Sequence, residues 1–283
     1  MAYKKKITNQ TFPNERDLYN ESDLLLEKCL FKGEEDGESA LKESQNIKVV
    51  DSTFALRYPL WHVNKCVLDN VVMEVTCRAP MWYSNYVDIT DSFLHGPKLI
   101  RECYDININN SDIESNEFAW KSKKITLNKC KFKSEYAFLD SSDVTINDSS
   151  LEGKYFFQYV NGGTIKNSNI VTKDAFWHAE NMYIYDSYIK SEYLGWYSKN
   201  LHFINCTIEG MQPLCYATGL VLENCKMVNC NLSFEYSDVK AKINGNIDSI
   251  KNPLSGEIIC DKVNEIILNN SKYPNKCVIK EKK

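Results

Sequence analysis

The chain has 283 residues, with 34 lysine and arginine residues against 38 aspartate and glutamate residues and a formal net charge of −4. This near-balanced charge offers no basic surface, so we expect no nucleic-acid partner. The lysines near the N-terminus are followed by polar residues and no apolar run could cross a bilayer, so we expect no signal peptide and no membrane association. The eleven cysteines are odd in number and lack paired spacing, which predicts reduced thiols and a cytoplasmic location.

A short phrase recurs along the chain and defines its elements. It holds two apolar residues one residue apart, one further residue, an Asn or Asp, a small residue, any residue and a large apolar residue, as in residues 106–113 and 125–132. Early in the chain Gln10, Cys29, Ser52 and Asn70 mark the small position, with steps of 19, 23 and 18 residues and then 22 to Ser92. From there the step is always 19, through Ser92, Ser111, Cys130, Ser149, Ser168, Ser187, Cys206 and Cys225.

The repeat predicts the fold. It is too short for a helical solenoid and its apolar residues alternate with period two, which indicates short strands joined by turns. Residues one repeat apart then lie over one another at about 4.8 Å, the spacing of hydrogen-bonded strands. We therefore predict an all-β parallel β-helix (solenoid) with about 19 residues per coil, forming one domain over residues 1–283. Residues 1–23 form the N-terminal cap and first coil, 24–245 the regular coils and 246–283 degenerate C-terminal coils and a cap, with a charged loop inserted at 33–38.

Four stretches carry a resemblance to a known family, namely GESALKES (37–44), YPLW (58–61), KDAFW (173–177) and EYLGW (192–196). Over essentially its whole length the chain is similar to an uncharacterised, mostly bacterial family, a domain of unknown function. Its coil phrase resembles that of pectin-lyase-like proteins, which implies a single-stranded right-handed parallel β-helix. No catalytic residue comes with the resemblance, because this fold carries lyases, hydrolases, adhesins and scaffolds alike.

All five tryptophans fall in one column, ten residues before the small residue of the phrase. The same column holds Arg101, Leu139, Gln158, Cys215 and Phe234 in the other coils. The next column reads His62, Tyr83, Glu102, Lys121, Asp140, Tyr159, His178, Tyr197, Tyr216 and Glu235. From these columns and one nearby acid we take as candidate ligand-binding residues Trp61, Trp82, Trp120, Trp177, Trp196, Tyr83, Tyr159, Tyr197, Tyr216 and Asp174.

Two orientations of the tryptophan column are open. With strict strand alternation the tryptophans stack in the core, which we favour because buried tryptophan is the commoner case, although Arg101 would then be buried too. If instead the uncharged preceding column, from Leu60 to Ser233, points inward, the tryptophans line a shallow cleft on a strand face. Flat aromatic faces with neighbouring hydroxyl and carboxylate groups would suit sugar rings.

The candidate catalytic residues are charged members of these columns. Glu102, Lys121 and Asp140 are consecutive, and Arg101 adjoins Glu102. Carboxylates two coils apart would lie roughly 9–10 Å from each other, near the upper limit for an inverting glycoside hydrolase. Arg101 or Lys121 could instead be the base of a lyase acting on an acidic sugar, and the remaining alternative is an exposed ion-pair ladder without function. His178, with Asp174 nearby, is a further acid–base candidate.

These observations predict a carbohydrate-binding or carbohydrate-processing protein whose ligand lies on the aromatic strand face. If it is an enzyme, we expect a polysaccharide or oligosaccharide lyase or a glycoside hydrolase. The alternative is a non-enzymatic scaffold that self-associates into a homo-oligomer through its ends or sheet faces. We predict no cofactor and no metal site, because the four histidines and the cysteines form no set of four ligands.

Overall fold

The computed structural model describes residues 3–34 and 38–282, so residues 35–37 of the predicted charged loop lie outside the described residues. The chain forms two compact units, Met1–Thr145 and Ile146–Lys283. In the described part of the chain every regular element is a strand. These residues include no helix suited to crossing a membrane.

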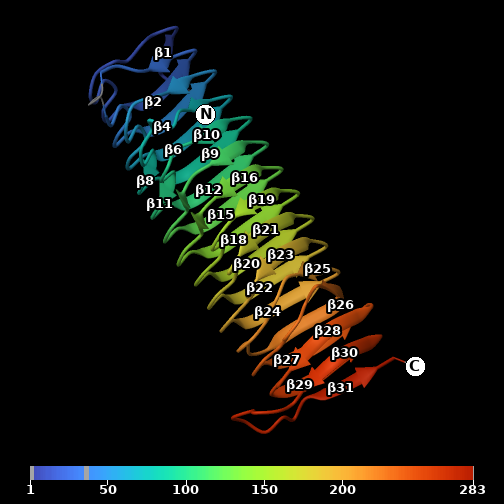
Figure 1. Ribbon diagram of the computed structural model, residues 1–283. Coiled ribbons are helices and arrows are strands. Elements are labelled where there is room, and N and C mark those ends of the chain that lie inside the picture. Colours follow the sequence, from blue (N-terminus) through green and yellow to red (C-terminus); the bar gives the residue numbers. More distant parts are fainter. Residues whose placement is uncertain (1–2, 35–37, 283) are drawn as a thin grey trace. The chain divides into compact units, whose positions relative to one another are not determined.

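The long strands of the first unit form a parallel sheet in which each strand pairs with the strand one coil later (Figure 1). Ile106 pairs with Ile125, nineteen residues on, as the repeat predicts. β-Branched residues at such positions favour the extended conformation. In order, the strands are β1 (Lys5–Thr8), β2 (Ser22–Glu27), β4 (Gln45–Val50), β6 (Asn64–Asp69), β9 (Asn85–Thr90), β12 (Tyr104–Asn109) and β15 (Lys123–Asn128).

Shorter parallel strands complete each coil of the first unit. One run consists of β3 (Leu30–Phe31), β5 (Thr53–Phe54), β7 (Val72–Met73), β10 (Phe93–His95), β13 (Asp112–Glu114) and β16 (Lys131–Ser134). Two further pairs are β8 (Met81–Trp82) with β11 (Ile100–Arg101) and β14 (Glu117–Phe118) with β17 (Tyr136–Ala137). Strand β18 (Ser142–Asn147) holds residues of both units.

The second unit is built in the same way. Met182 pairs with Leu201, nineteen residues later, whereas Val239 pairs with Gly256, seventeen residues later, so the irregular C-terminal coils remain paired. The long strands are β20 (Asn161–Lys166), β22 (Glu180–Tyr185), β24 (Lys199–Ile204), β26 (Leu220–Val228), β27 (Asp238–Ile243), β29 (Ser255–Cys260) and β31 (Val278–Glu281). The others are β19 (Ser150–Gly153), β21 (Asn169–Lys173), β23 (Tyr188–Glu192), β25 (Thr207–Glu209), β28 (Asn246–Lys251) and β30 (Lys262–Ile267).

The core of each unit is the pair of apolar columns of the phrase. Ile106 and Ile108 in the first unit, and Met182 and Ile184 in the second, have no exposed surface. The residue between each pair faces outward, because successive side chains of a strand alternate. The predicted all-β parallel solenoid with about nineteen residues per coil is therefore confirmed.

The small residue of the phrase lies inside a buried corner. Ser111 Oγ accepts a hydrogen bond from the Ser92 N–H (3.1 Å) and donates one to the Asn109 carbonyl oxygen (2.8 Å). The assignment of Asn70 to this column is wrong by one residue. Val71 occupies the position, and its N–H donates to Ser92 Oγ (3.1 Å). The phrase misled because valine is larger than the other members of the column.

The Asn or Asp before the small residue turns the chain through a left-handed backbone, with φ of 52° at Asp91 and 46° at Asn110. The two residue types alternate from Asp51 to Asn110 and again from Asp148 to Asn205, and Asn110 Nδ2 donates to the Asp91 carboxylate. Lys129 takes the position between these two runs, and after Asn205 the column continues with Asn224 and Asn244. An amide between two carboxylates keeps like charges from stacking at the strand spacing. The same bond joins Asn70 to Asp51 (2.7 Å), Asn167 to Asp148 (3.2 Å) and Asn205 to Asp186 (2.9 Å).

Candidate functional site

The tryptophan column lies at a corner of the coil rather than on a strand. Phe176 and His178, on either side of Trp177, both have left-handed backbones, with φ of 59° and 54°. Two such residues around one position turn the chain, so the first side chain points inward and the second outward. Only Trp82 and Arg101 of this column belong to short strands. The expected strand face therefore holds for the short pair β8 and β11 and is wrong for the later coils, where the sequence does not reveal the paired left-handed residues.

The column that precedes the tryptophans points inward. Strict alternation fails at this corner, where Leu99 and Ile100 are both buried and Arg101 is half-buried. The tryptophans themselves are half-buried in all five coils, so they do not form the core that we favoured. The buried column consists of Leu60, Met81, Ile100, Ala119, Phe138, Phe157, Phe176, Gly195, Leu214 and, in the longer last coil, Phe234 in place of the predicted Ser233.

Each tryptophan indole is hydrogen-bonded to the backbone of the next coil. The acceptor is always the carbonyl three residues before the next member of the column, so each indole N–H clamps two coils together. Gln158 makes the same bond through Nε2 to the Asp174 carbonyl oxygen (3.2 Å). The five indole bonds are Trp61 to Ala79 (2.6 Å), Trp82 to Lys98 (3.0 Å), Trp120 to Tyr136 (2.9 Å), Trp177 to Tyr193 (2.7 Å) and Trp196 to Gln212 (2.8 Å).

The faces of the tryptophan rings are covered by their neighbours. Trp177 and Trp196 stack with centroids 5.6 Å apart and planes 6° from parallel. In the first unit Trp61 and Trp82 stack at 5.5 Å. The Arg101 guanidinium continues this stack, 5.0 Å from the Trp82 ring and 5.8 Å from the Trp120 ring. A ligand therefore meets ring edges at this corner, and the expected stacking of sugars on these inner faces does not fit.

The outward residue that follows each tryptophan position forms a second stack. In the second unit its members are Tyr159, His178, Tyr197, Tyr216 and Tyr236, which we call the aromatic ladder. Successive ring centroids lie 4.8, 5.1, 4.8 and 5.8 Å apart. Tyr159 is 52% exposed and Tyr197 is 45% exposed. Successive coils thus present aromatic edges to solvent.

Sequence reasoning missed Tyr236 and placed Glu235 in this column. The N–H of Tyr197 bonds to the Cys215 carbonyl oxygen, but the N–H of Tyr216 bonds to that of Glu235, so this coil is one residue longer. The one signal in the sequence was the aromatic residue itself, next to the position that the 19-residue count selected.

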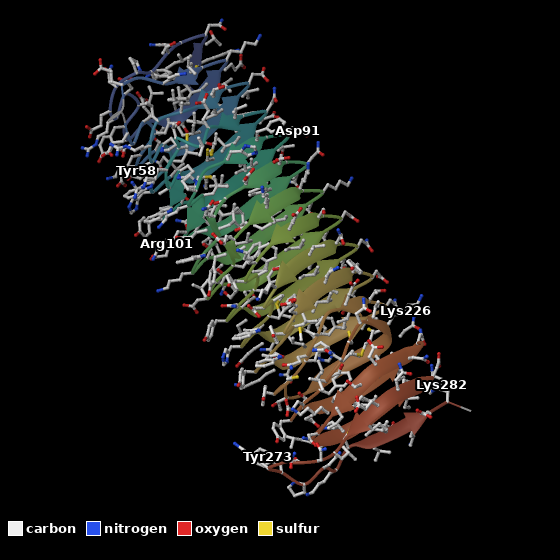
Figure 2. All side chains as sticks on the ribbon, in the orientation of Figure 1. Tyr58, Asp91, Arg101, Lys226, Tyr273 and Lys282 are labelled. Carbon is white, nitrogen blue, oxygen red and sulfur yellow. The ribbon has the colours of Figure 1, made fainter. Side chains whose placement is uncertain are left out.

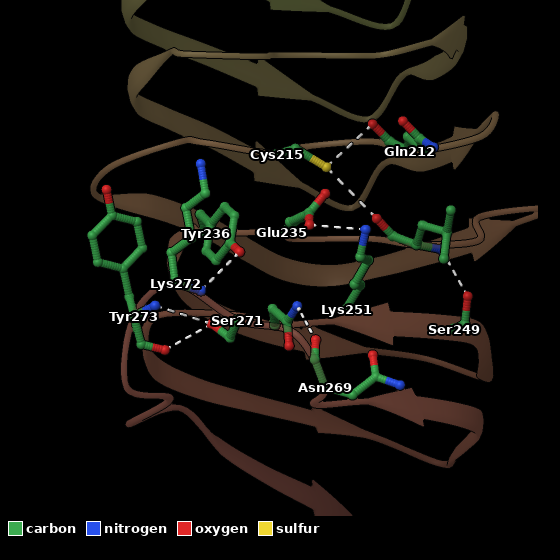
Figure 3. A network of polar contacts seen from close by, with 12 residues as sticks. Gln212, Cys215, Glu235, Tyr236, Ser249, Lys251, Asn269, Ser271, Lys272 and Tyr273 are labelled. Atoms are coloured by element: carbon green, nitrogen blue, oxygen red, sulfur yellow. Dashed lines mark hydrogen bonds and ion pairs between the residues drawn. The ribbon is translucent and has the colours of Figure 1, made fainter.

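The lower end of the aromatic ladder is held by polar contacts (Figure 3). Tyr236 Oη accepts a hydrogen bond from the Lys272 N–H (3.2 Å), and the Tyr273 ring stands edge-on to Tyr236 at 5.4 Å. The Glu235 carboxylate pairs with Lys251 (2.9 Å). The aromatic ladder therefore ends against the turn that holds Lys272 and Tyr273, and the charge of Glu235 beside it is balanced by Lys251.

Asp174 and His178, the predicted acid–base pair, do not meet. Among the described residues the structure records no hydrogen bond between the Asp174 carboxylate and His178, whose ring is stacked between Tyr159 and Tyr197. Asp174 is 9% exposed, and burial raises the pKa of its carboxyl, an effect that Lys173 opposes and Glu192 supports. The backbone carbonyl oxygen of Asp174 accepts the hydrogen bond from Gln158 Nε2, so this buried acid lies next to the side-chain bond that joins the two coils.

The predicted charged residues of the first unit occupy one column, as the spacing implies. The Glu102 N–H bonds to the Trp120 carbonyl oxygen and the Lys121 N–H to that of Leu139, which places Glu102, Lys121 and Asp140 in register. All three are exposed. Arg101 Nε lies 3.5 Å from Glu102 Oε1, while Lys121 makes no ion pair within the described ranges. A catalytic role for these residues stays a prediction. Figure 2 shows Tyr58 and Arg101 on one side of the first unit and Asp91 on the other.

The cysteines are free thiols, and ten of the eleven are buried. Burial raises the pKa of Cys66, Cys103 and Cys230 to about 12, so these thiols stay protonated near neutral pH. Within residues 3–34 and 38–282 no three His, Cys, Asp or Glu side chains are grouped so that they could hold a metal ion.

The chain belongs to the family described as "Protein of unknown function (DUF3737)", whose family model matches residues 5–280. No curated protein matches the sequence. Among solved structures it is similar to ORF18 of Geobacillus virus E2, with a TM-score of 0.42 and 8% identity, over 78% of this chain and 53% of that one. The chain thus spans about half the length of that structure.

Two further solved structures are similar over most of this chain. PfbA, a surface adhesin of Streptococcus pneumoniae, has a TM-score of 0.34 and 9% identity, over 86% of this chain and 72% of that one. The A-module of the mannuronan C-5 epimerase AlgE4 of Azotobacter vinelandii has a TM-score of 0.32 and 10% identity, over 85% and 89%. At such scores these structures say nothing of what this chain binds.

Proposed function

We propose that the protein binds carbohydrate along the aromatic ladder of the second unit. The observation that carries the proposal is the uninterrupted stack from Tyr159 through His178 and Tyr197 to Tyr216, with centroids 4.8–5.1 Å apart and two of the four rings about half exposed. Large aromatic groups left in solvent on successive coils form a contiguous patch, and such patches mark binding sites more often than bare surface.

The chemistry of the ladder suits a ligand rich in hydroxyl groups. Because the rings face one another, their edges carry the phenol oxygens and the imidazole nitrogens outward, and these groups both donate and accept hydrogen bonds. Burial and the nearby Glu235 raise the pKa of Tyr216, so its hydroxyl remains a proton donor at neutral pH. The acids beside the ladder are paired, with Glu192 lying 3.7 Å from Lys173. The patch is therefore polar without being strongly charged.

The repeat of the ladder favours an extended ligand. Each rung is one coil from the next, so an oligosaccharide lying along the stack contacts several rungs at once. Each added contact raises the affinity, because the entropy of association is lost only once. We expect affinity to rise with chain length until the ladder from Tyr159 to Tyr236 is covered.

The experiment compares two single-atom changes in a glycan-array screen followed by calorimetry with the best oligosaccharide. Tyr197→Phe keeps the ring and the stack but removes the outward hydroxyl. The matched control, Tyr86→Phe, removes the hydroxyl of a tyrosine that is 48% exposed but lies in the first unit, outside the ladder. We expect Tyr197→Phe to weaken binding by about threefold to tenfold and Tyr86→Phe to leave it unchanged. An array without any binding glycan, or equal affinities for both variants, contradicts the proposal.

We place self-association through the open strand edges second. The strand β1 pairs with β2, the strand β31 pairs with β29, and both β1 and β31 carry lysines. In β1, Lys5 pairs with Glu21 (2.8 Å) and Lys6 with Glu27 (2.8 Å). In β31, Lys280 pairs with Glu257. Lysines on edge strands oppose edge-to-edge pairing, since such pairing removes their charges from water. We expect an elution volume in size-exclusion chromatography that does not change with protein concentration.

A further inference from the structure

Two coils of the first unit are longer than the repeat, and we call the described residues of their insertions, 32–34 and 74–80, the first and the second loop. Leu24 pairs with Ile47, 23 residues on, and Cys66 pairs with Val87, 21 residues on. The pairing of Phe31 with Phe54 and of Glu38 with Arg57 places the first insertion after Phe31 and before Glu38. The second falls within residues 74–80, because Phe54 pairs with Met73 nineteen residues on, as the repeat requires.

The coil between the two loops has no insertion, so it lies lower than both and leaves a hollow. Ala55, Leu56 and Arg57 of this coil form the floor, and residues of the two loops form the walls. We call this hollow the loop pocket. Its volume is about 500 Å³, within the range of roughly 300–1,000 Å³ that is typical of small-molecule sites.

Both loops are anchored by backbone contacts. A Cβ atom on Gly33 would lie 1.9 Å from the Pro13 carbonyl oxygen, so only glycine fits where the first loop leaves the coil. In the second loop the Cys77 N–H bonds to the Glu74 carbonyl oxygen (2.8 Å) and the Cys77 thiol to that of Phe54 (2.9 Å). A buried thiol fixed to the floor coil holds this wall in place. The loop pocket is therefore a preformed hollow on a rigid scaffold, where binding sites are commonly found.

The lining joins an apolar surface to cationic groups. Val75, which is 71% exposed, and Pro97 are apolar parts of the wall. The cations are Lys32, Arg57 and Arg78 against the carboxylates of Glu34 and Glu74, and two of the four arginines of the chain are thus found here. The Nη2 atom of Arg57 lies 3.9 Å from the Oε2 atom of Glu38. Arg78 is exposed, and within the described residues its guanidinium has neither an ion pair nor a hydrogen bond.

We propose that the loop pocket binds a small molecule with an apolar body and an anionic head, a carboxylate or a phosphate, which Arg78 recognises. The apolar body lies over Leu56 and against Val75 and Pro97. The head lies at Arg78, because a guanidinium presents paired N–H donors that match two oxygens of a carboxylate or phosphate. This site is in the first unit and does not depend on the aromatic ladder.

The test is calorimetry of the full chain with four probes: hexanoate, hexyl phosphate, hexylammonium and inorganic phosphate. We expect the first two to bind and their order to distinguish carboxylate from phosphate recognition. Hexylammonium should fail for lack of an anion, and inorganic phosphate should bind at least tenfold more weakly than hexyl phosphate, since it lacks the apolar body.

Two variants locate the site. Arg78→Gln should weaken the better probe by about tenfold or more, as expected for a charged hydrogen bond, and Val75→Glu, at an exposed position that tolerates the change, should do the same by repelling the anion. Arg16→Gln, a surface arginine outside the loop pocket that pairs with Glu15 (3.1 Å), is the matched control and should change nothing. Equal binding of hexylammonium, or unchanged affinity in Arg78→Gln, overturns the proposal.

Discussion

Each unit contains the same kind of corner at the tryptophan column, but the residues that the corner presents to solvent differ between the units. In both, a left-handed residue such as Tyr83 or His178 follows the tryptophan, and an indole N–H joins consecutive coils. In the second unit the outward position is aromatic from Tyr159 to Tyr236, whereas in the first the stacked pair of His62 and Tyr83 gives way to charged residues. The clamp recurs in both units, although Arg101 and Leu139 take its position in two coils, and the outward position is where the units differ. Function is best sought in that outward column.

The largest expected effect comes from breaking what the units share. Trp177→Ala should lower the free energy of unfolding by about 2–4 kcal/mol, because a half-buried ring and a hydrogen bond to the next coil are lost together. Trp82→Ala in the first unit should cost a similar amount, and urea denaturation measures both.

Trp177→Phe separates the two contributions. It retains a stacked ring without the N–H donor, so we expect a loss of about 1 kcal/mol. If neither alanine variant costs more than the phenylalanine variant, the rings do not stabilise the corner and the shared clamp is a wrong description.

The next effect tests the difference between the units by exchanging their outward residues. Tyr197→Glu removes two ring contacts, to His178 and Tyr216, and should cost about 1–3 kcal/mol. Glu102→Tyr in the first unit places a ring beside Tyr83 and should gain about 0.5–1 kcal/mol. Thermal unfolding of the two variants provides the comparison. A loss in both would mean that the first unit needs the charge of Glu102.

The smallest effect concerns the buried acid of the second unit. Because burial raises the pKa of Asp174 in the folded state, its contribution to stability is fully present below the ordinary carboxyl pKa and is lost as pH rises through the raised value. Asp174→Asn should therefore stabilise the protein near neutral pH, by less than about 1 kcal/mol, and show no such gain near pH 3. Urea midpoints at both pH values measure it, and the exposed Asp248→Asn is the control. A gain that does not change with pH would contradict the assignment.

The fold could be predicted because nearly every coil repeats the same chemistry at the same spacing. Ile106 and Ile108 recur as inward pairs, and nineteen residues later their equivalents pair with them. The two errors have different causes. The step of nineteen from Ser52 leads to Val71, but the preference for a small residue selected Asn70. Glu235 was placed where Tyr236 lies because a sequence does not show where within a longer coil the extra residue is accommodated.

The sequence predicted that the candidate residues share columns but not the geometry of those columns, and their role as a site stays a prediction. The tryptophans were found because they share a column. The direction of their rings depends on left-handed residues such as Phe176 and Tyr197, and aromatic residues rarely adopt this conformation, so the sequence does not predict it. Gln158 in the same column was an overlooked sign that a side-chain donor is needed there. The loop pocket could not be found, because the insertions after Phe31 and after Met73 become neighbours only once the coil between them is built.

The alternation of Asp and Asn along the bend column has a consequence for how such a chain can grow. Removing the coil of Asn167 would set Asp148 against Asp186, two like charges one strand spacing apart. Removing the coils of Asn167 and Asp186 together would set Asn205 against Asp148 and preserve the donor–acceptor order. Length changes by gene duplication or deletion within the alternating coils, 148–205, should therefore be tolerated best in even numbers, whereas from Asn205 to Asn244, where amide stacks on amide, parity imposes no limit.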